Sequence, residues 1–146
     1  MELSFTLVPP DGKHKTKKNG MMIRKAGAKR FIANSGKTIA VESEYRQQAR
    51  NAMAEAGSEP ILGPIELAVC FVFPIPKSRR KELKATVWRD ERPDAPTLAE
   101  MICDALQGPC YADDAQIARL VSSKVWANVE TPTVLVQIKS LENKVA

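Results

Sequence analysis

Residues 65–73 constrain the fold of this chain more than any other segment. Their sequence, IELAVCFVF, is apolar at every position except Glu66 and is rich in β-branched and aromatic residues. Such a run, followed by Pro74 and Pro76, is typical of a central strand that is buried on both faces. At 146 residues the chain is long enough to build a core around this strand. We therefore expect one domain that covers residues 1–146.

Strands and helices alternate along the rest of the chain. Alternating or β-rich runs predict strands over residues 2–8, 21–24, 29–33, 65–73, 117–126 and 133–138. A helical period predicts helices over residues 38–56, 79–87 and 95–106. The buried face of the first helix is expected to hold Ile39, Val41, Tyr45, Ala49, Ala52 and Met53, with Glu42 and Arg46 on the solvent side. This order predicts an α+β fold in which helices pack against one mixed β-sheet.

Composition argues against several classes of protein. No apolar run approaches the roughly 20 residues that a membrane helix needs, and no charged and then apolar leader opens the chain. We therefore expect a cytoplasmic protein that makes no contact with a membrane. Its three cysteines are an odd number without CxxC spacing, which indicates neither a disulfide framework nor a zinc site.

Positive charge is concentrated in two segments. Residues 13–37 contain nine Lys or Arg and no acid, and residues 77–92 contain seven basic residues against three acidic ones. Lysine-rich loops also serve solubility alone, but two dense segments beside an acidic cluster favour a polyanionic partner. Residues 11–37 are expected to form a loop and a hairpin. The side chains expected to contact phosphates are Lys13, Lys15, Lys17, Lys18, Arg24, Lys25, Lys29, Arg30, Lys77, Arg79, Arg80, Lys81, Lys84 and Arg92.

Five carboxylates lie within 21 residues of this otherwise basic chain: Asp94, Glu100, Asp104, Asp113 and Asp114. Each has an ordinary explanation, as a helix cap, a solvated helix face or a turn. Together they predict a site for Mg²⁺ or Mn²⁺, because hard oxygen ligands bind these ions and leave positions for water and a phosphate oxygen. The spacing leaves open which end of the helix over residues 95–106 the pair Asp113 and Asp114 returns to.

The same stretch resembles the signature of the RusA family of Holliday junction resolvases, including its phage-borne members. The matching residues are Arg92, Pro93, Asp94, Leu98, Asp104, Ala105, Leu106, Tyr111, Asp113, Asp114, Ala115, Gln116 and Ile117. Residues 73–78 and Lys124 resemble further recurrent positions, and Lys124 joins the DNA-binding candidates. The resemblance implies a RusA-like fold and a homodimeric, magnesium-dependent endodeoxyribonuclease. Such an enzyme nicks four-way or other branched DNA symmetrically in recombination and repair and uses no small-molecule cofactor.

The resemblance implies catalytic roles for Asp94 and Asp114, but two positions depart from the family pattern. Pro96 stands in place of a second catalytic aspartate, and Glu100 stands in place of a catalytic lysine. Glu100 lies four residues after Pro96, one helical turn further along a similar face. We therefore expect a migrated ligand, so that Asp94, Glu100 and Asp114 hold the metal and Asp113 assists.

The lost lysine leaves more than one interpretation open. Either Arg92 or Lys124 supplies the missing positive charge in an active enzyme, or the chain is a catalytically degenerate, structure-selective DNA-binding protein of the same fold. An RNA-binding basic domain is a third and weaker interpretation of the same charge pattern. Trp88, in the second basic segment, either stacks on an unpaired base or, as is more common, packs beneath its own helix.

Overall fold

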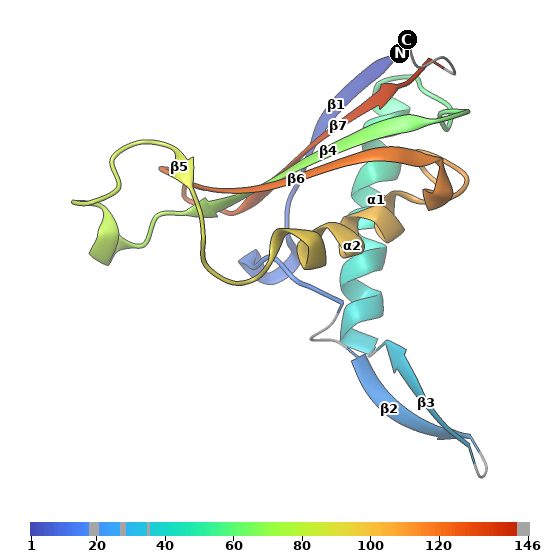
Figure 1. Cartoon of the computed structure of the whole chain (residues 1–146), viewed down its shortest axis with the longest axis horizontal. Helices are drawn as coiled ribbons and strands as arrows, with labels where there is room; N and C mark the ends of the chain where they lie inside the picture. The colour runs from blue at the N-terminus through green and yellow to red at the C-terminus, as the bar shows by residue number, and fades with distance from the viewer. Residues whose placement is uncertain (18–20, 27–28, 35, 143–146) are drawn as a thin grey trace.

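A five-stranded β-sheet, with helices α1 (Gly36–Glu55) and α2 (Ala95–Leu106) against one face, forms the body of the protein (Figure 1). The computed structural model describes residues 1–17, 21–26, 29–34 and 36–142. In chain order the strands are β1 (Glu2–Leu7), β2 (Met21–Ala26), β3 (Lys29–Asn34), β4 (Ile65–Pro74), β5 (Val87–Trp88), β6 (Ile117–Ala127) and β7 (Thr133–Ser140). The sheet order is β1-β7-β4-β6-β5, in which β4 and β6 are parallel and the other neighbours antiparallel. The predicted α+β fold with a mixed sheet is confirmed.

Strand β4 is central, as predicted, but it is deeply buried mainly on one face. Leu67, Val69 and Phe71 point toward the helices and are at most 1% exposed. Ala68 and Cys70 on the opposite face are only half-buried. The prediction of burial on both faces is therefore wrong. Small apolar residues on the second face produce the same continuous apolar run as a doubly buried strand, so the sequence pattern does not separate the two cases.

Helix α1 packs against α2 and β1 through Thr38, Val41, Tyr45, Ala49 and Met53. Ile39 was predicted on this face but is 50% exposed. Successive residues of a helix are rotated by about 100°, so the turn that buries Thr38 points Ile39 toward solvent.

Gly57 ends α1, as the sequence predicts, in a left-handed conformation with a φ of 63°. The Ser58 N–H donates to the Met53 carbonyl (2.9 Å) and the Gly57 N–H to the Ala54 carbonyl (3.0 Å), as in a Schellman motif. A Cβ at position 57 would meet no atom within 4 Å, so Gly57→Ala is expected to lower the free energy of unfolding through backbone strain alone, by about 1 kcal/mol. Urea unfolding measures the change. Gly36→Ala is the control, because Gly36 also has open space but no positive φ, and an equal loss there would contradict this explanation.

Residues 79–87 do not form the predicted helix. They follow a 3₁₀ turn (Lys77–Arg79) and end in β5, which pairs with β6. The guanidinium of Arg79 pairs with Glu91 (3.1 Å) across the loop, and Trp88 is 78% exposed rather than packed beneath a helix. Pairing with a distant strand therefore outweighs a weak local helical preference.

Strands β2 and β3 form an antiparallel hairpin that projects away from the five-stranded sheet (Figure 1). Both strands were predicted, and each is slightly longer than expected. Gly27, the predicted joint between them, lies outside the described residues.

Helix α2 contacts both α1 and β6. Its predicted apolar face is confirmed by four residues that are at most 1% exposed: Leu98, Met101, Ile102 and Ala105. The hydroxyl of Ser122 on β6 donates to the Ala95 carbonyl (2.8 Å), which ties the N-terminal end of α2 to the sheet. In the part of the chain that the structure describes, no helix combines the length and the apolar character needed to cross a membrane.

Candidate active site

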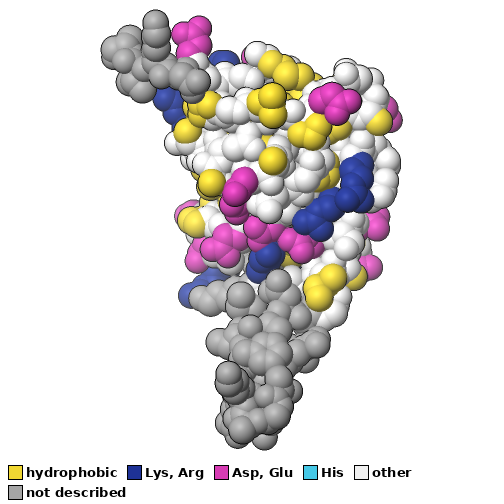
Figure 2. All heavy atoms as spheres, turned by 90° about the vertical axis from the view of Figure 1, so that its right-hand side faces the viewer, with side chains coloured by type: hydrophobic (Ala, Val, Ile, Leu, Met, Phe, Trp, Pro, Cys, Tyr) yellow, Lys and Arg dark blue, Asp and Glu magenta, His cyan; other side chains and the backbone are white. Residues whose placement is uncertain are grey.

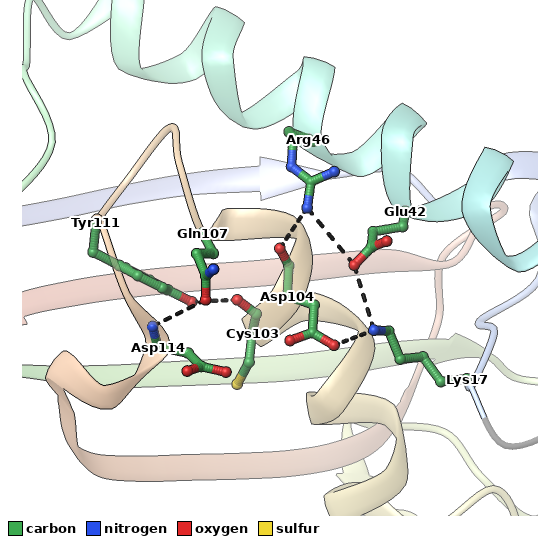
Figure 3. A network of polar contacts seen from close by, with 8 residues as sticks. All are labelled: Lys17, Glu42, Arg46, Cys103, Asp104, Gln107, Tyr111 and Asp114. Carbon is green, nitrogen blue, oxygen red and sulfur yellow. Dashed lines mark hydrogen bonds and ion pairs between the residues drawn. The ribbon is translucent and has the colours of Figure 1, made fainter. Parts of the chain in front are cut away.

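The chain returns from α2 to β6 through a turn at residues 107–116, and buried contacts fix its path. Tyr111 is fully buried, and its hydroxyl donates to the Cys103 carbonyl on α2 (2.6 Å). The side-chain oxygen of Gln107 accepts a hydrogen bond from the Asp114 N–H (3.1 Å). The turn therefore brings Asp114 to the C-terminal end of α2 (Figure 3). This answers the question that the sequence spacing left open.

The side chain of Gln116 joins this turn to the loop before β4. Its amide oxygen accepts from the N–H groups of Ala112 (2.9 Å) and Asp113 (3.2 Å). Its amide nitrogen donates to the carbonyls of Ile61 (2.9 Å) and Gly63 (3.0 Å). One side chain thus pairs four backbone groups. Sequence reasoning matched Gln116 to a motif without giving it a role, and its place in that motif was the only signal.

Asp113 caps the 3₁₀ turn Asp114–Gln116. Its carboxylate accepts from the Ala115 N–H (2.9 Å), and the Gln116 side chain accepts from the Asp113 N–H in return. This reciprocal arrangement is a capping box. Turn chemistry therefore accounts for Asp113, whose carboxyl group also shares a hydrogen bond with that of Asp114.

The carboxyl groups of Asp104, from α2, and Asp114, from the turn, lie on either side of the Cys103 side chain (Figure 3) and are close enough to interact electrostatically. The hydrogen bond with Asp113 raises the pKa of Asp114, and slight burial and the negative charge of Asp104 raise it further. Glu100 is exposed one helical turn before Asp104. Like charges held together in this way favour a cation between them.

Lys17 and Arg46 place positive charge beside Asp104. The ammonium of Lys17 contacts the Asp104 carboxylate and lies 3.5 Å from the Glu42 carboxylate. The guanidinium of Arg46 lies 3.7 Å from Glu42 and donates to the Asp104 backbone carbonyl (2.7 Å). Burial lowers the pKa of Lys17, but the two carboxylates together outweigh burial and raise that pKa overall. Figure 2 shows acidic side chains gathered across this side of the molecule, with basic side chains beside them.

Sequence reasoning missed Glu42 and Arg46 as members of this cluster. Both were expected on the solvent face of the first helix. Arg46 bonds to a residue 58 positions further along the chain, and no local pattern indicates a contact of that kind.

Asp94 lies at the opposite end of α2 from Asp114. It occupies the N-cap position, but its side chain makes no capping hydrogen bond. The 12 residues of α2 separate the two positions, about 18 Å along the axis. The cause is topological: α2 runs back along β6, so a short return turn reaches only its C-terminal end. The structure thus brings Asp104 and Asp114 together and does not bring Asp94 to them.

The expected ligand set of Asp94, Glu100 and Asp114 is therefore not assembled within one chain. Among the described residues, no three Asp, Glu, His or Cys side chains are grouped so that they could hold a metal ion. The Asp104–Asp114 pair is the cluster that resembles the expected site most closely.

Lys124 supports the loop that leads to Asp94. Its ammonium donates to the backbone carbonyls of Glu91 (2.6 Å) and Pro93 (2.9 Å). Arg92, between these two residues, is exposed. Of the two candidates for the lost positive charge, Lys124 is therefore engaged with the backbone, whereas Arg92 faces solvent.

The predicted phosphate-binding residues differ in their exposure. The exposed ones are Lys13, Lys77, Arg80, Lys81, Lys84 and Arg92. Lys15, Lys17 and Arg79 are half-buried, and the latter two form ion pairs. The hairpin of β2 and β3 carries Arg24, Lys25, Lys29 and Arg30, and Lys18 lies outside the described residues.

His14 belongs to the protein interior rather than to a basic surface. Its Nε2 lies 2.9 Å from the Val72 carbonyl, and its ring packs against Phe71 and Phe73. Burial lowers the pKa of His14, and the positive charge of Arg89 lowers it further, against the opposing effect of the Val72 hydrogen bond. His14 is therefore neutral at pH 7 and adds no charge to the first basic segment.

Comparison with known protein families supports the resemblance noted in the sequence. A family model described as Endodeoxyribonuclease RusA matches residues 8–139, nearly the whole chain. A search of curated proteins finds no match.

Proposed function

Because the chain belongs to the RusA family of endodeoxyribonucleases, we propose that it cuts branched DNA, with the four-way Holliday junction as its preferred substrate. It acts in recombination or repair as a homodimer, because a two-fold dimer presents one site to each of two equivalent strands. Its cofactor is Mg²⁺, for which Mn²⁺ can substitute.

The observation that carries this proposal is the approach of Asp104 and Asp114 from two separate segments. Carboxylate oxygens are suitable ligands for a hard cation, and Mg²⁺ is often held by only one or two carboxylates and keeps several waters. The negative charge of Asp104 adds to the rise in the pKa of Asp114 that the hydrogen bond with Asp113 and slight burial produce, and a cation would offset that charge. Bound there, the metal would lower the pKa of a water and offset charge on the scissile phosphate.

The chain's own residues hold this pair in place. Gln107 fixes the Asp114 backbone, and Arg46 fixes the Asp104 backbone. Lys17 offsets the charge of Asp104 in the absence of metal. The exposed basic residues of segment 77–92 and the basic residues of the β2–β3 hairpin then bind the DNA backbone, with little sequence information in those contacts.

Asp94 and Glu100 keep their proposed roles as catalytic carboxylates, and a separate structural observation supports each of them. Asp94 is exposed and makes no capping bond, so its carboxylate is available to a ligand. Glu100 is exposed and lies one helical turn before Asp104 on α2. Asp113 acts by positioning Asp114 rather than by binding the metal.

The alternative is a catalytically degenerate protein that binds junctions without cutting them. Pro96 and Glu100 support it, since they remove a carboxylate and a lysine from the family pattern. The separation of Asp94 from Asp114 along α2 supports it as well.

A synthetic four-way junction distinguishes the two. We expect paired, symmetric nicks in the presence of Mg²⁺ or Mn²⁺, none with EDTA, and none in a linear duplex of the same sequence. Junction affinity is expected to fall by about 10³-fold between about 50 and 200 mM salt, because each neutralised phosphate releases a counterion. Tight binding without nicks at any metal concentration would establish the degenerate alternative. Tighter binding to structured RNA than to the junction would reject both.

A further inference from the structure

Trp88 presents an aromatic ring to solvent at the edge of the sheet. Its side chain is 78% exposed, whereas the other tryptophan of the chain, Trp126, is 8% exposed. Residues 79–87 form no helix beneath which Trp88 could pack. An indole left in water contributes little to the core, because little of its apolar surface is buried. The ring of Trp88 is therefore available to a ligand.

The backbone around Trp88 is fixed, so the indole is held in one place. Trp88 pairs with Val125 of β6, and the N–H of the next residue, Arg89, donates to a carbonyl of β6 (3.0 Å). On the other face of the sheet, the guanidinium of Arg89 packs over the rings of Phe73 (3.8 Å to the centroid) and Trp126 (4.7 Å). An aromatic side chain that is positioned before binding loses little conformational freedom when a ligand contacts it.

Positive charge surrounds Trp88 along the chain on both sides. The exposed basic side chains of segment 77–92 are Lys77, Arg80, Lys81, Lys84 and Arg92. This segment has three acids, of which Glu82 and Glu91 pair with Arg79 (4.0 and 3.1 Å). Asp90 is the third. The neighbourhood of the indole therefore carries an excess of exposed positive charge.

This charge decides what the indole can contact. A second copy of the same segment is a poor partner, because it would bring like charges together. An aromatic ring among Lys and Arg side chains is instead typical of proteins that bind single-stranded nucleic acid, in which the ring stacks on a base and the cations contact nearby phosphates. Stacking requires an uncovered base face, which a continuous duplex does not offer. The fitting ligand is therefore an unpaired or unstacked base.

Trp88 lies at the same end of α2 as Asp94, a proposed catalytic carboxylate. Figure 1 shows the chain passing from β5 to the start of α2. On β6, Val125 is opposite Trp88, and the hydroxyl of Ser122 donates to the carbonyl of Ala95 (2.8 Å). These two β6 positions are three residues apart, about 10 Å along the strand. A DNA strand with a base at Trp88 therefore passes close to the N-terminal end of α2.

We propose that Trp88 stacks on an unpaired or unstacked base at the branch point of the DNA, while the exposed cations of segment 77–92 hold the phosphates beside it. The proposal rests on the branched DNA of the proposed function and names a contact that distinguishes such DNA from a linear duplex. A base at a branch lacks a stacking neighbour on one side, so turning it toward the indole costs less than extracting a base from a continuous duplex.

Tryptophan fluorescence of the full chain tests this contact, with EDTA present so that no DNA is cut. Trp88 is exposed and Trp126 is buried, so a base can stack only on the former. A four-way junction is expected to quench the wild-type emission, and a linear duplex of the same sequence is expected to leave it nearly unchanged. Trp88→Phe retains Trp126 alone and should show no quenching by the junction. Equal quenching by both DNAs, or quenching that persists in Trp88→Phe, would overturn the inference.

Trp88→Leu separates stacking from apolar contact in general, because leucine keeps an apolar side chain and removes the aromatic face. In a gel-shift titration, junction affinity is expected to fall by about 10-fold and duplex affinity by less than about twofold. Trp88→Phe keeps an aromatic face and should bind the junction within about threefold of the wild type. Lys84→Ala is the matched control, since the loss of a phosphate contact should weaken binding to both DNAs by the same factor.

Equal losses on junction and duplex in Trp88→Leu, or no loss on either, would contradict the stacking contact. A change in the sedimentation of Trp88→Leu would also contradict it, because Trp88 would then belong to a contact between protein chains. If Trp88→Leu fails to fold, the fluorescence of Trp88→Phe decides. Failure of the proposed function is separate, because neither measurement involves cutting: junction binding that depends on Trp88 but produces no nicks with Mg²⁺ supports the stacking contact and refutes the nuclease.

Discussion

Replacing Asp114 by Asn is expected to reduce junction nicking by about 10³-fold or more, because the proposed carboxylate ligand of the metal becomes a neutral amide. Junction affinity should change by less than about threefold, since phosphate contacts by Lys and Arg supply most of it. Single-turnover nicking and a gel-shift titration on the same four-way junction measure the two effects. Asp104→Asn should resemble Asp114→Asn, because the two carboxylates act as a pair.

Asp113→Asn is the matched control one residue away. Asparagine caps a turn as well as aspartate does, and the Asp113 carboxylate already accepts from the Ala115 N–H. Nicking by this variant should therefore stay within about tenfold of the wild type. Equal losses at positions 113 and 114 would contradict the distinction between a positioning residue and a metal ligand.

Asp94→Asn tests whether Asp94, at the N-terminal end of α2, is needed for nicking. A loss as large as that of Asp114→Asn would show that both ends of the helix are needed for cutting. Wild-type rates would limit the catalytic centre to the Asp104–Asp114 end.

Gln116→Ala is expected to lower the free energy of unfolding by about 2–6 kcal/mol. The change leaves the backbone groups of Ile61, Gly63, Ala112 and Asp113 without their present partner, and each lost bond typically costs about 0.5–1.5 kcal/mol. Urea unfolding measures the loss. Nicking should also fall, because the turn that carries Asp114 loses its link to the loop before β4.

Gln116→Glu separates the two halves of this contact. The carboxylate keeps the acceptor for Ala112 and Asp113 but loses the donor to Ile61 and Gly63. An intermediate stability is therefore expected. A Gln116→Ala variant as stable as the wild type would show that water replaces all four bonds and that Gln116 does not hold the turn.

Strands and helices with a strong apolar period were predictable from sequence. Segments whose structure depends on contacts with residues far along the chain were not. β4 and α2 were found because their apolar residues form a continuous run and a helical period, respectively. Residues 79–87 were mistaken for a helix, because β5 exists only through pairing with β6. The exposure of Ile39 follows from the rotation of α1 against α2, which the helix sequence alone does not fix.

At the site, the residue types were predictable and their partners were not. The acidic cluster and its proximity to basic segments could be identified from the chain alone. That Asp114 meets Asp104 rather than Asp94 depends on the direction of α2 along β6, which is a property of the whole sheet. Glu42, Arg46 and Gln116 act through contacts far apart in sequence, so local periodicity indicated none of them.

Two hydrogen bonds, one at each end of α2, limit where a chain of this fold can gain or lose residues. Ser122 holds Ala95 at one end, and Asp114 meets Gln107 just past the other. Inserting or deleting one residue within the helix would turn one end by about 100° and shift it by about 1.5 Å, which would break one of these bonds. We therefore expect insertions and deletions to be tolerated in the exposed loop between β4 and β5, and α2 to keep a fixed length.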